Sequence, residues 1–260
     1  MLVSSTYRNY LDDVVRMERV LNNGISYSDS RYTSPGFLPF NPAMRDFHNA
    51  MATFDLAALR DWAVVNALMV AYRNDPFDRV DAVYALFMKE AIVPEYRDSL
   101  IAFRQRMLRV KPGVKAPAIS LKDEKGKLVS LDDFKGKLVY LDFWGVYCGP
   151  CIGDIEGYAA KIHARYKDKP VVFVTICADA KPEKWKETLA KYKMDGVNLH
   201  AADGRRSDVL DNYGVNGIPH YFLIDENGII LDNNAPRLSE LDRTENNTLD
   251  KALGKLTASK

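Results

Sequence analysis

The first 110 residues carry apolar side chains at helical spacing. In the run 10–21, apolar residues recur three and four positions apart, which predicts one apolar helix face. A loop rich in glycine and proline follows over 22–42. Further helical patterns cover 43–73, 78–91 and 94–109. This part of the chain is therefore predicted to be all-helical, and it shows no catalytic constellation.

The remainder of the chain alternates short apolar runs with amphipathic stretches. The short runs predict strands at 117–121, 127–130, 137–143, 170–177, 197–201, 219–225 and 228–232. The amphipathic stretches predict helices at 149–167, 182–193, 206–213 and 246–256. The segment 225–228, Asp-Glu-Asn-Gly, lies between two apolar runs and predicts a hairpin turn. The mixture indicates an α/β fold, with a sheet covered by helices on both faces.

The two halves differ in their cations. Lys89 and Lys111 are the only lysines up to residue 111, and lysine dominates after it. The segment 111–117, Lys-Pro-Gly-Val-Lys-Ala-Pro, has the proline and glycine content of a linker. We therefore expect a helical region of unknown role over 1–111 and an α/β domain over 112–260.

Composition excludes several function classes. The chain has 260 residues, a formal net charge of +1, 47% hydrophobic and 27% charged residues. The small charge argues against a nucleic-acid partner, which usually requires a strong basic excess. No apolar run approaches the roughly 20 residues of a membrane span. The N-terminus lacks a basic region leading into an apolar run, so we expect either a cytoplasmic protein or a trimmed segment of a secreted precursor.

Three cysteines are too few for a disulfide scaffold, but two of them are spaced for redox chemistry. Cys148 follows the predicted buried strand and stands at the start of the next helix, where free amides and the helix dipole stabilise a thiolate. Cys151, one turn later, is expected to be more buried and able to close a disulfide onto Cys148. A zinc site would need two more ligands, and none are spaced for it. We therefore expect no cofactor or metal beyond this cysteine pair, and treat Cys177 as a small buried hydrophobe.

Residues 113–256 resemble the thioredoxin superfamily, and within it the TlpA/ResA-like group. The resemblance depends on Trp144-x-x-x-Cys148-Gly149-Pro150-Cys151, on Gly217-Ile218-Pro219 before a strand, and on the long interval between these motifs. It implies a thioredoxin-like fold and a thiol–disulfide oxidoreductase. The implied partners are protein thiols or disulfides and an upstream electron donor, in the periplasm or cell envelope.

The resemblance also implies roles for individual residues. Asp142 occupies the position of the buried aspartate that helps to deprotonate the second cysteine, and Asp154 stands where the group usually has a glutamate. Asp154 is equally consistent with an ordinary acid in the first turn of a helix. The residues expected to contact substrate are Trp144, Tyr147, Gly149, Pro150, Ile218, Pro219 and His220.

The chain departs from the group at two positions. Glu156 stands where the group has a proline, so the helix is expected to lack its kink. His220 replaces a threonine after the expected cis-proline, and its imidazole either titrates beside the disulfide or points away from it.

Two other functions remain open from the residues. Residues 113–143 also resemble the start of a peroxiredoxin domain, which would imply a thiol peroxidase, although Gly145 stands where those enzymes have a threonine. A non-enzymatic protein that binds a partner through the helical region is the third possibility. The Gly-Pro pair between the cysteines is that of reducing thioredoxins, so we expect a reductase with a potential of roughly −250 mV.

Overall fold

The computed structural model describes residues 57–204 and 207–258. The chain divides into two compact units, one ending at Gln105 and the other covering Arg106–Lys260. The helix predicted over 10–21, the loop over 22–42 and the start of the 43–73 pattern lie outside the described residues. The predicted domain boundary at 111 stays a prediction.

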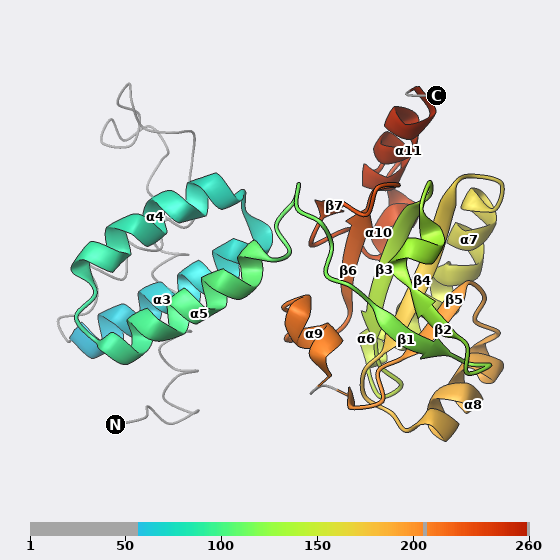
Figure 1. Cartoon of the computed structure of the whole chain (residues 1–260), viewed down its shortest axis with the longest axis horizontal. Coiled ribbons are helices and arrows are strands. Elements are labelled where there is room, and N and C mark those ends of the chain that lie inside the picture. Colours follow the sequence, from blue (N-terminus) through green and yellow to red (C-terminus); the bar gives the residue numbers. More distant parts are fainter. Residues whose placement is uncertain (1–56, 205–206, 259–260) are drawn as a thin grey trace. The chain divides into compact units, whose positions relative to one another are not determined.

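The described part of the first unit consists of helices, as the apolar spacing predicted (Figure 1). They are α3 (Ala57–Asn74), α4 (Phe77–Glu90) and α5 (Pro94–Leu108), the last of which runs on into the second unit. The turn before α5 is held by the buried Asp61, whose carboxylate accepts hydrogen bonds of 2.7 Å from the backbone amides of Ile92 and Val93. A buried carboxylate requires such donors, so these two hydrogen bonds explain why Asp61 is buried.

A seven-stranded mixed sheet forms the second unit. In chain order its strands are β1 (Ser120–Asp123), β2 (Leu128–Ser130), β3 (Leu138–Trp144), β4 (Val171–Cys177), β5 (Val197–His200), β6 (His220–Ile224) and β7 (Ile230–Asp232). Their spatial order is β2-β1-β5-β4-β3-β6-β7. The central strands β3, β4 and β5 are parallel, and the outer pairs are antiparallel. The predicted strands and the hairpin between β6 and β7 are confirmed, with ends shifted by up to three residues.

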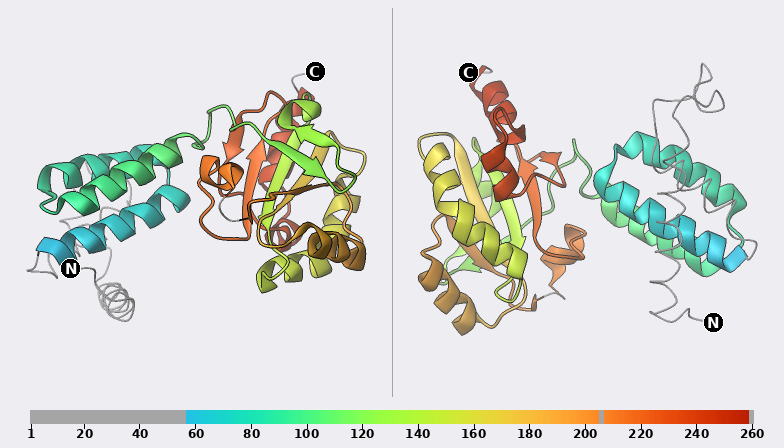
Figure 2. Two further views of the ribbon diagram at one scale, coloured as in Figure 1. Left: turned by 60° about the horizontal axis from the view of Figure 1, so that its bottom comes forward. Right: turned by 180° about the vertical axis from the view of Figure 1, so that it is seen from behind.

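Helices cover both faces of this sheet (Figure 2). They are α6 (Gly149–Asp154), α7 (Ala160–Tyr166), α8 (Pro182–Tyr192), α9 (Asp208–Asn212), α10 (Leu238–Arg243) and α11 (Thr248–Ala258); a short 3₁₀ turn, η1, covers Leu131–Phe134. Helices α7, α10 and α11 pack on the face of the sheet that carries the side chains of Tyr140 and Tyr221. On the other face, Tyr213, which directly follows α9, packs with Phe143 and Phe222. The sequence pattern missed α10.

The helix after the cysteine pair is not regular. A π-helical segment, η2 (Ile155–Ala159), separates α6 from α7. The sequence did not predict this segment, and the expectation that Glu156, in place of proline, leaves the helix without a kink stays a prediction. A π-turn widens a helix through its own backbone hydrogen bonds, so the absence of proline does not keep a helix regular.

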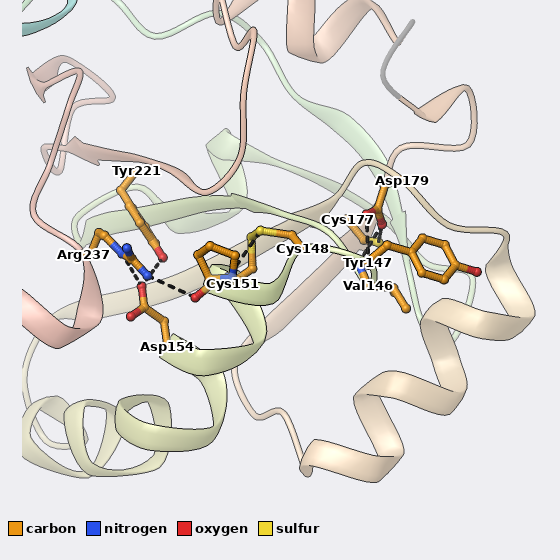
Figure 3. The surroundings of a disulfide bond; sticks show 10 residues. Val146, Tyr147, Cys148, Cys151, Asp154, Cys177, Asp179, Tyr221 and Arg237 are labelled. Carbon is orange, nitrogen blue, oxygen red and sulfur yellow. Dashed lines mark hydrogen bonds and ion pairs between the residues drawn. A yellow bond between two sulfur atoms is a disulfide. The ribbon is translucent and has the colours of Figure 1, made fainter.

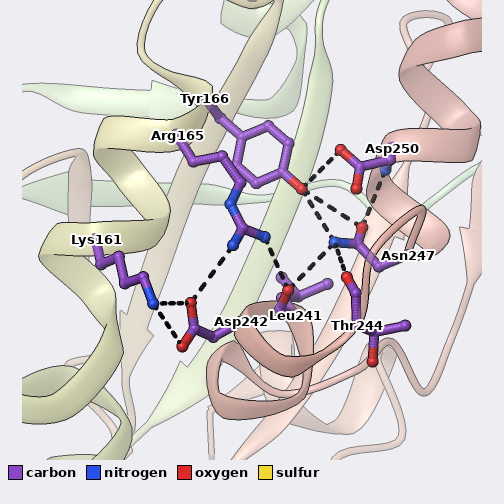
Figure 4. Close-up of polar contacts among 8 residues, drawn as sticks. All are labelled: Lys161, Arg165, Tyr166, Leu241, Asp242, Thr244, Asn247 and Asp250. Carbon is purple, nitrogen blue, oxygen red and sulfur yellow. Dashed lines mark hydrogen bonds and ion pairs between the residues drawn. The ribbon is translucent and has the colours of Figure 1, made fainter.

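The C-terminal helices are tied to α7 by polar contacts (Figure 4). Lys161 and Arg165 of α7 both contact Asp242 of α10, the lysine Nζ at 2.7 Å. Tyr166 donates a hydrogen bond of 3.0 Å to Asp250 of α11 and also contacts Asn247, which is buried in front of α11. These contacts hold the end of α10 and the start of α11 against α7.

Candidate active site

The cysteine pair lies where the central strand β3 ends and α6 begins. Cys148 is the N-cap residue of α6, and its sulfur accepts a hydrogen bond of 3.2 Å from the Cys151 amide. The two cysteines form a disulfide with their Cα atoms 5.2 Å apart. Cys148 is partly exposed, whereas Cys151 is 1% exposed. The predicted arrangement of one accessible and one buried cysteine is confirmed.

A buried apolar cluster supports the disulfide from beneath. Cys151 packs with Trp144, Ile155, Cys177 and Trp185. Trp144 is 0% exposed, so its expected role as a substrate contact is wrong: its indole fills the core under Cys151. Sequence alone could not separate these roles, because an aromatic residue at a strand end suits either.

The surface around Cys148 is formed by neighbouring residues of the motif. Tyr147 is 72% exposed, and Gly149 and Pro150 are also exposed. Across the disulfide, the Ile218–Pro219 peptide bond is cis, as the resemblance implied, and Ile218 packs against the cluster that contains Cys151. These residues surround the accessible sulfur with a small, largely apolar surface.

His220 points away from this surface. It pairs with Phe143 across β6 and β3, and successive side chains of a strand lie on opposite faces of the sheet, so His220 lies on the face opposite Tyr221. Its Nε2 donates a hydrogen bond of 2.8 Å to the Asn233 carbonyl, and its ring packs on Phe222. The expectation that His220 contacts substrate is therefore wrong, and the alternative orientation is the one found.

Asp142 is a buried acid on β3, facing the helix that carries the cysteines. It is 6% exposed, and its Oδ1 has no hydrogen-bond partner among the described residues. Burial raises the pKa of Asp142 well above its ordinary value, and the neighbouring Asp154 adds to this, whereas Arg237 opposes it. A groove of about 720 Å³ is lined by Asp142, Glu156 and Thr175 among others. Asp142 is thus a buried carboxyl that holds its proton more tightly than an exposed aspartate does.

Asp154 is held by two donors at the end of α6 (Figure 3). Its buried Oδ2 accepts a hydrogen bond of 2.8 Å from the Tyr221 hydroxyl and another of 2.8 Å from Arg237 Nε. Arg237 Nη2 also donates to the Pro150 carbonyl at 3.0 Å. The burial and these contacts distinguish Asp154 from an ordinary exposed acid of a first helical turn.

A second carboxylate, Asp179, holds the loop on the other side of the disulfide (Figure 3). Its two oxygens accept hydrogen bonds of 2.6 and 3.0 Å from the amides of Val146 and Tyr147. A side chain at Gly145 would place its Cβ 2.2 Å from Asp179 Oδ2, so this approach requires glycine. Asp179 therefore fixes the backbone that leads into Cys148.

Sequence reasoning missed both Arg237 and Asp179. Each belongs to a segment without a recognisable motif, and each acts through contacts with residues 32 or more positions away. For Asp179 the available signal was an acid two residues after the buried parallel strand β4, because such strand ends gather at one edge of a sheet.

Cys177 is not part of the reactive pair. It is buried and reduced, and burial raises its pKa to about 11. This confirms its expected place in the core. Within the described residues, no group of three or more His, Cys, Asp or Glu side chains is arranged to hold a metal ion.

The fold and the site define a class of protein. A parallel strand that leads into a helix capped by one cysteine of a Cys-x-x-Cys disulfide, with a cis-proline alongside, is the arrangement of thioredoxin-like dithiol proteins. Residues 111–253 match the Redoxin family model, and the chain belongs to this family.

The relatives narrow the class further. The chain is 32% identical over 124 residues to the thiol–disulfide oxidoreductase ResA of Bacillus thuringiensis, and equally to that of Bacillus anthracis, covering 48% of this chain and 69% of the relative. This protein is therefore a ResA-like thiol–disulfide oxidoreductase with a redox-active disulfide, Cys148–Cys151.

Among similar solved structures, one shares the fold at a TM-score of 0.50. The C-terminal domain of a thiol–disulfide oxidoreductase from Bacteroides thetaiotaomicron superposes with a TM-score of 0.50 at 22% identity, over 56% of this chain and 99% of that one. The thioredoxin domain of a thiol–disulfide oxidoreductase from Bacteroides vulgatus is 33% identical, with a TM-score of 0.49, over 55% of this chain and 98% of that one. Within the described residues, no helix is both long and apolar enough to cross a membrane.

Proposed function

We propose that this protein reduces disulfides of protein substrates, with Cys148 as the nucleophile and Cys151 as the resolving cysteine. The observation that carries the proposal is the asymmetry of the pair: Cys148 is accessible at a helix N-terminus, and Cys151 is buried behind it. A thiolate at a helix N-terminus is stabilised, and an accessible one meets a substrate disulfide first.

The reaction has two exchange steps. The Cys148 thiolate of the reduced protein attacks one sulfur of a substrate disulfide, which forms a mixed disulfide and releases the other sulfur as a thiolate. Cys151 then loses its proton and attacks Cys148, so that the second substrate sulfur leaves as a thiolate and Cys148–Cys151 closes. The substrate gains two electrons and the protein loses two. An upstream dithiol donor must restore them before the next cycle.

Asp142 accepts the Cys151 proton in this proposal. Its raised pKa suits a base that works near neutrality, and the groove beside it provides a route by which the proton reaches solvent. Asp154 acts from the opposite end of α6, through its charge rather than by contact with substrate. Tyr147, Gly149, Pro150, Ile218 and Pro219 form the surface that receives the substrate.

The proposal also covers the cellular location of the protein and the boundary of its redox domain. The resemblance to the TlpA/ResA-like group favours action in the periplasm or cell envelope, with the cytoplasm as the alternative. The resemblance to the Redoxin family begins at residue 111, which favours a redox domain over 112–260 preceded by a separate helical region.

Reduction of insulin disulfides by the pre-reduced protein tests the chemistry. We expect Cys148→Ser to abolish it and Cys151→Ser to accumulate a mixed disulfide with the substrate. Cys177→Ala is the matched control, because it removes the cysteine outside the pair, and it should leave the rate unchanged. Insulin reduction that survives Cys148→Ser would refute the assignment of the nucleophile.

A peroxidase assay separates the alternative function. Peroxiredoxin chemistry would need a threonine at Gly145, and a side chain there would collide with Asp179. We therefore expect no peroxide consumption by the reduced protein beyond that of free dithiols. Catalysed peroxide consumption that exceeds insulin reduction would favour the peroxidase.

A further inference from the structure

Arg237 lies outside every motif of the active site, yet it contacts that site at two points. It is the N-cap residue of α10, and its own amide is fixed by a hydrogen bond of 3.0 Å to Glu240. From there its guanidinium reaches the Asp154 carboxylate at 2.8 Å and the Pro150 carbonyl at 3.0 Å. Pro150 lies between the two cysteines, so Arg237 joins the C-terminal helices directly to the disulfide loop.

The Asp154 carboxylate needs this partner because it is almost completely buried. Its side chain is 4% exposed, whereas that of Arg237 is 38% exposed and in contact with water. The Tyr221 hydroxyl also binds Asp154, but it brings no positive charge. An isolated buried carboxylate is strongly disfavoured unless it is paired and hydrogen-bonded. Arg237 supplies the positive charge.

The same charges act on Asp142. Burial is the main cause of its raised pKa, Asp154 raises that pKa further, and Arg237 lowers it. The ionisable groups that act on this pair come from β3, β6, α6 and the start of α10: they are Tyr140, Asp142, Asp154, Tyr221, Arg237 and Glu240. The groove that Asp142 lines adds charged and titratable groups from η2, α7 and the residue after it, α8 and the segment after α8: Glu156, His163, Lys167, Lys191, Tyr192, Lys193 and Asp195. Arg237 is the cation that contacts Asp154 and whose charge acts on Asp142.

We propose that Arg237 is a positioning residue of the disulfide site, which balances the Asp154 charge so that Asp142 faces a neutral ion pair rather than a lone carboxylate. This proposal rests on the proposed function in one respect, since Asp142 is taken to be the base for Cys151. Without the guanidinium, Asp142 faces an unbalanced negative charge and holds its own proton to higher pH. The Pro150 carbonyl also loses its donor, which loosens the turn between the cysteines.

Two single variants test the charge. The measurement is the titration midpoint of the Asp142 side-chain carboxyl, followed by ¹³C NMR in the oxidised protein. Arg237→Met should raise this midpoint by about one pH unit, the lower end of what one nearby charge produces. Arg237→Lys, which keeps the charge, should restore most of the wild-type value.

The double variant Arg237→Met/Asp154→Asn separates charge from structure. It removes both members of the ion pair, so the midpoint should return close to that of the unaltered protein. A purely structural effect of losing Arg237 would persist in the double variant. Asp154→Asn alone should lower the midpoint, because the guanidinium is then unbalanced, and it provides the test if Arg237→Met does not fold.

Arg165→Met is the matched control. Arg165 is also a partly exposed arginine, with 34% of its side chain exposed, and it pairs with Asp242 near the C-terminal end of α10. The Arg165→Met variant should leave the Asp142 titration midpoint unchanged. An unchanged midpoint in Arg237→Met, or a raised midpoint that persists in the double variant, would overturn the proposal.

Insulin reduction over the same pH range distinguishes the two proposals. If both hold, the alkaline shift of the Asp142 midpoint in Arg237→Met appears as an equal shift in the pH profile of the rate. If the unaltered protein does not reduce insulin, the proposed function fails, and the NMR titration still decides the role of Arg237.

Discussion

Asp142 should lower the stability of this protein at neutral pH, and the dependence on pH follows from its burial. Its carboxyl is buried, its Oδ1 has no hydrogen-bond partner in the described part of the chain, and its pKa in the folded state is raised well above the ordinary value. In the unfolded chain the same group has a pKa of about 3.9. Below that pH both states hold the proton, so the group adds no pH-dependent difference. Above it, only the unfolded chain gains free energy from ionisation.

The magnitude is set by one proton. While Asp142 stays protonated in the folded state and is ionised in the unfolded state, the free energy of unfolding falls by about 1.4 kcal/mol per pH unit. The fall stops at the folded-state pKa. Asp142→Asn removes the ionisation and keeps the shape of the side chain. The variant should therefore gain stability relative to the unaltered protein, by about 1.4 kcal/mol for each pH unit above roughly pH 4.5 until the plateau.

Urea unfolding of the oxidised proteins between pH 4 and pH 8 measures this difference. Asp132→Asn is the matched control, because Asp132 is 69% exposed and pairs with the exposed Lys135. Its curve should run parallel to that of the unaltered protein. A difference between Asp142→Asn and the unaltered protein that is the same at pH 4 and pH 7.5 would refute the reasoning, since it would show that the folded carboxyl ionises as it does in water.

Two further predictions concern the surroundings of the disulfide. Asp179→Asn should destabilise the protein by about 1.5–3 kcal/mol, because a charged acceptor of hydrogen bonds from backbone amides is lost. Urea unfolding measures this loss of stability. Hydrogen exchange of the Val146 and Tyr147 amides should also accelerate. Unchanged exchange would show that Asp179 does not hold the loop. In the native reduced protein, iodoacetamide at pH 8 should alkylate the accessible Cys148 and leave Cys177 unmodified, because Cys177 is buried and its pKa is raised to about 11. An adduct at Cys177 that forms before unfolding, detected by mass spectrometry, would contradict this.

The local pattern of apolar and polar residues was sufficient to predict the strand that leads to the cysteines and the helix that carries them. The apolar run of β3 followed by an amphipathic stretch placed Cys148 at a helix N-terminus, and the structure confirms this. The prediction needed only the spacing of apolar residues along a few turns or a few strand positions. The π-helical segment at Ile155–Ala159 was not predicted, because a π-turn has no residue signature comparable to that of proline.

Side-chain direction was less predictable than element position. Trp144 and His220 belong to the expected motifs, but one is buried beneath Cys151 and the other lies on the opposite face of the sheet. A shift of one residue in strand register exchanges the two faces, so orientation depends on the pairing with neighbouring strands. That pairing becomes visible only when β3 and β6 are placed side by side.

The sequence by itself determined the reactive disulfide, the cis-proline segment and the alternation of strands and helices, because each depends on residues within a few positions of one another. Only the tertiary structure decided which charges surround them. Asp154 and Arg237 are 83 positions apart, and Val146 and Asp179 are 33 apart. Such pairs meet because the sheet order places β4 and β6 on either side of β3. The position of Cys148 at a helix N-terminus is thus a local property of the sequence, whereas the charges around the disulfide are a property of the fold.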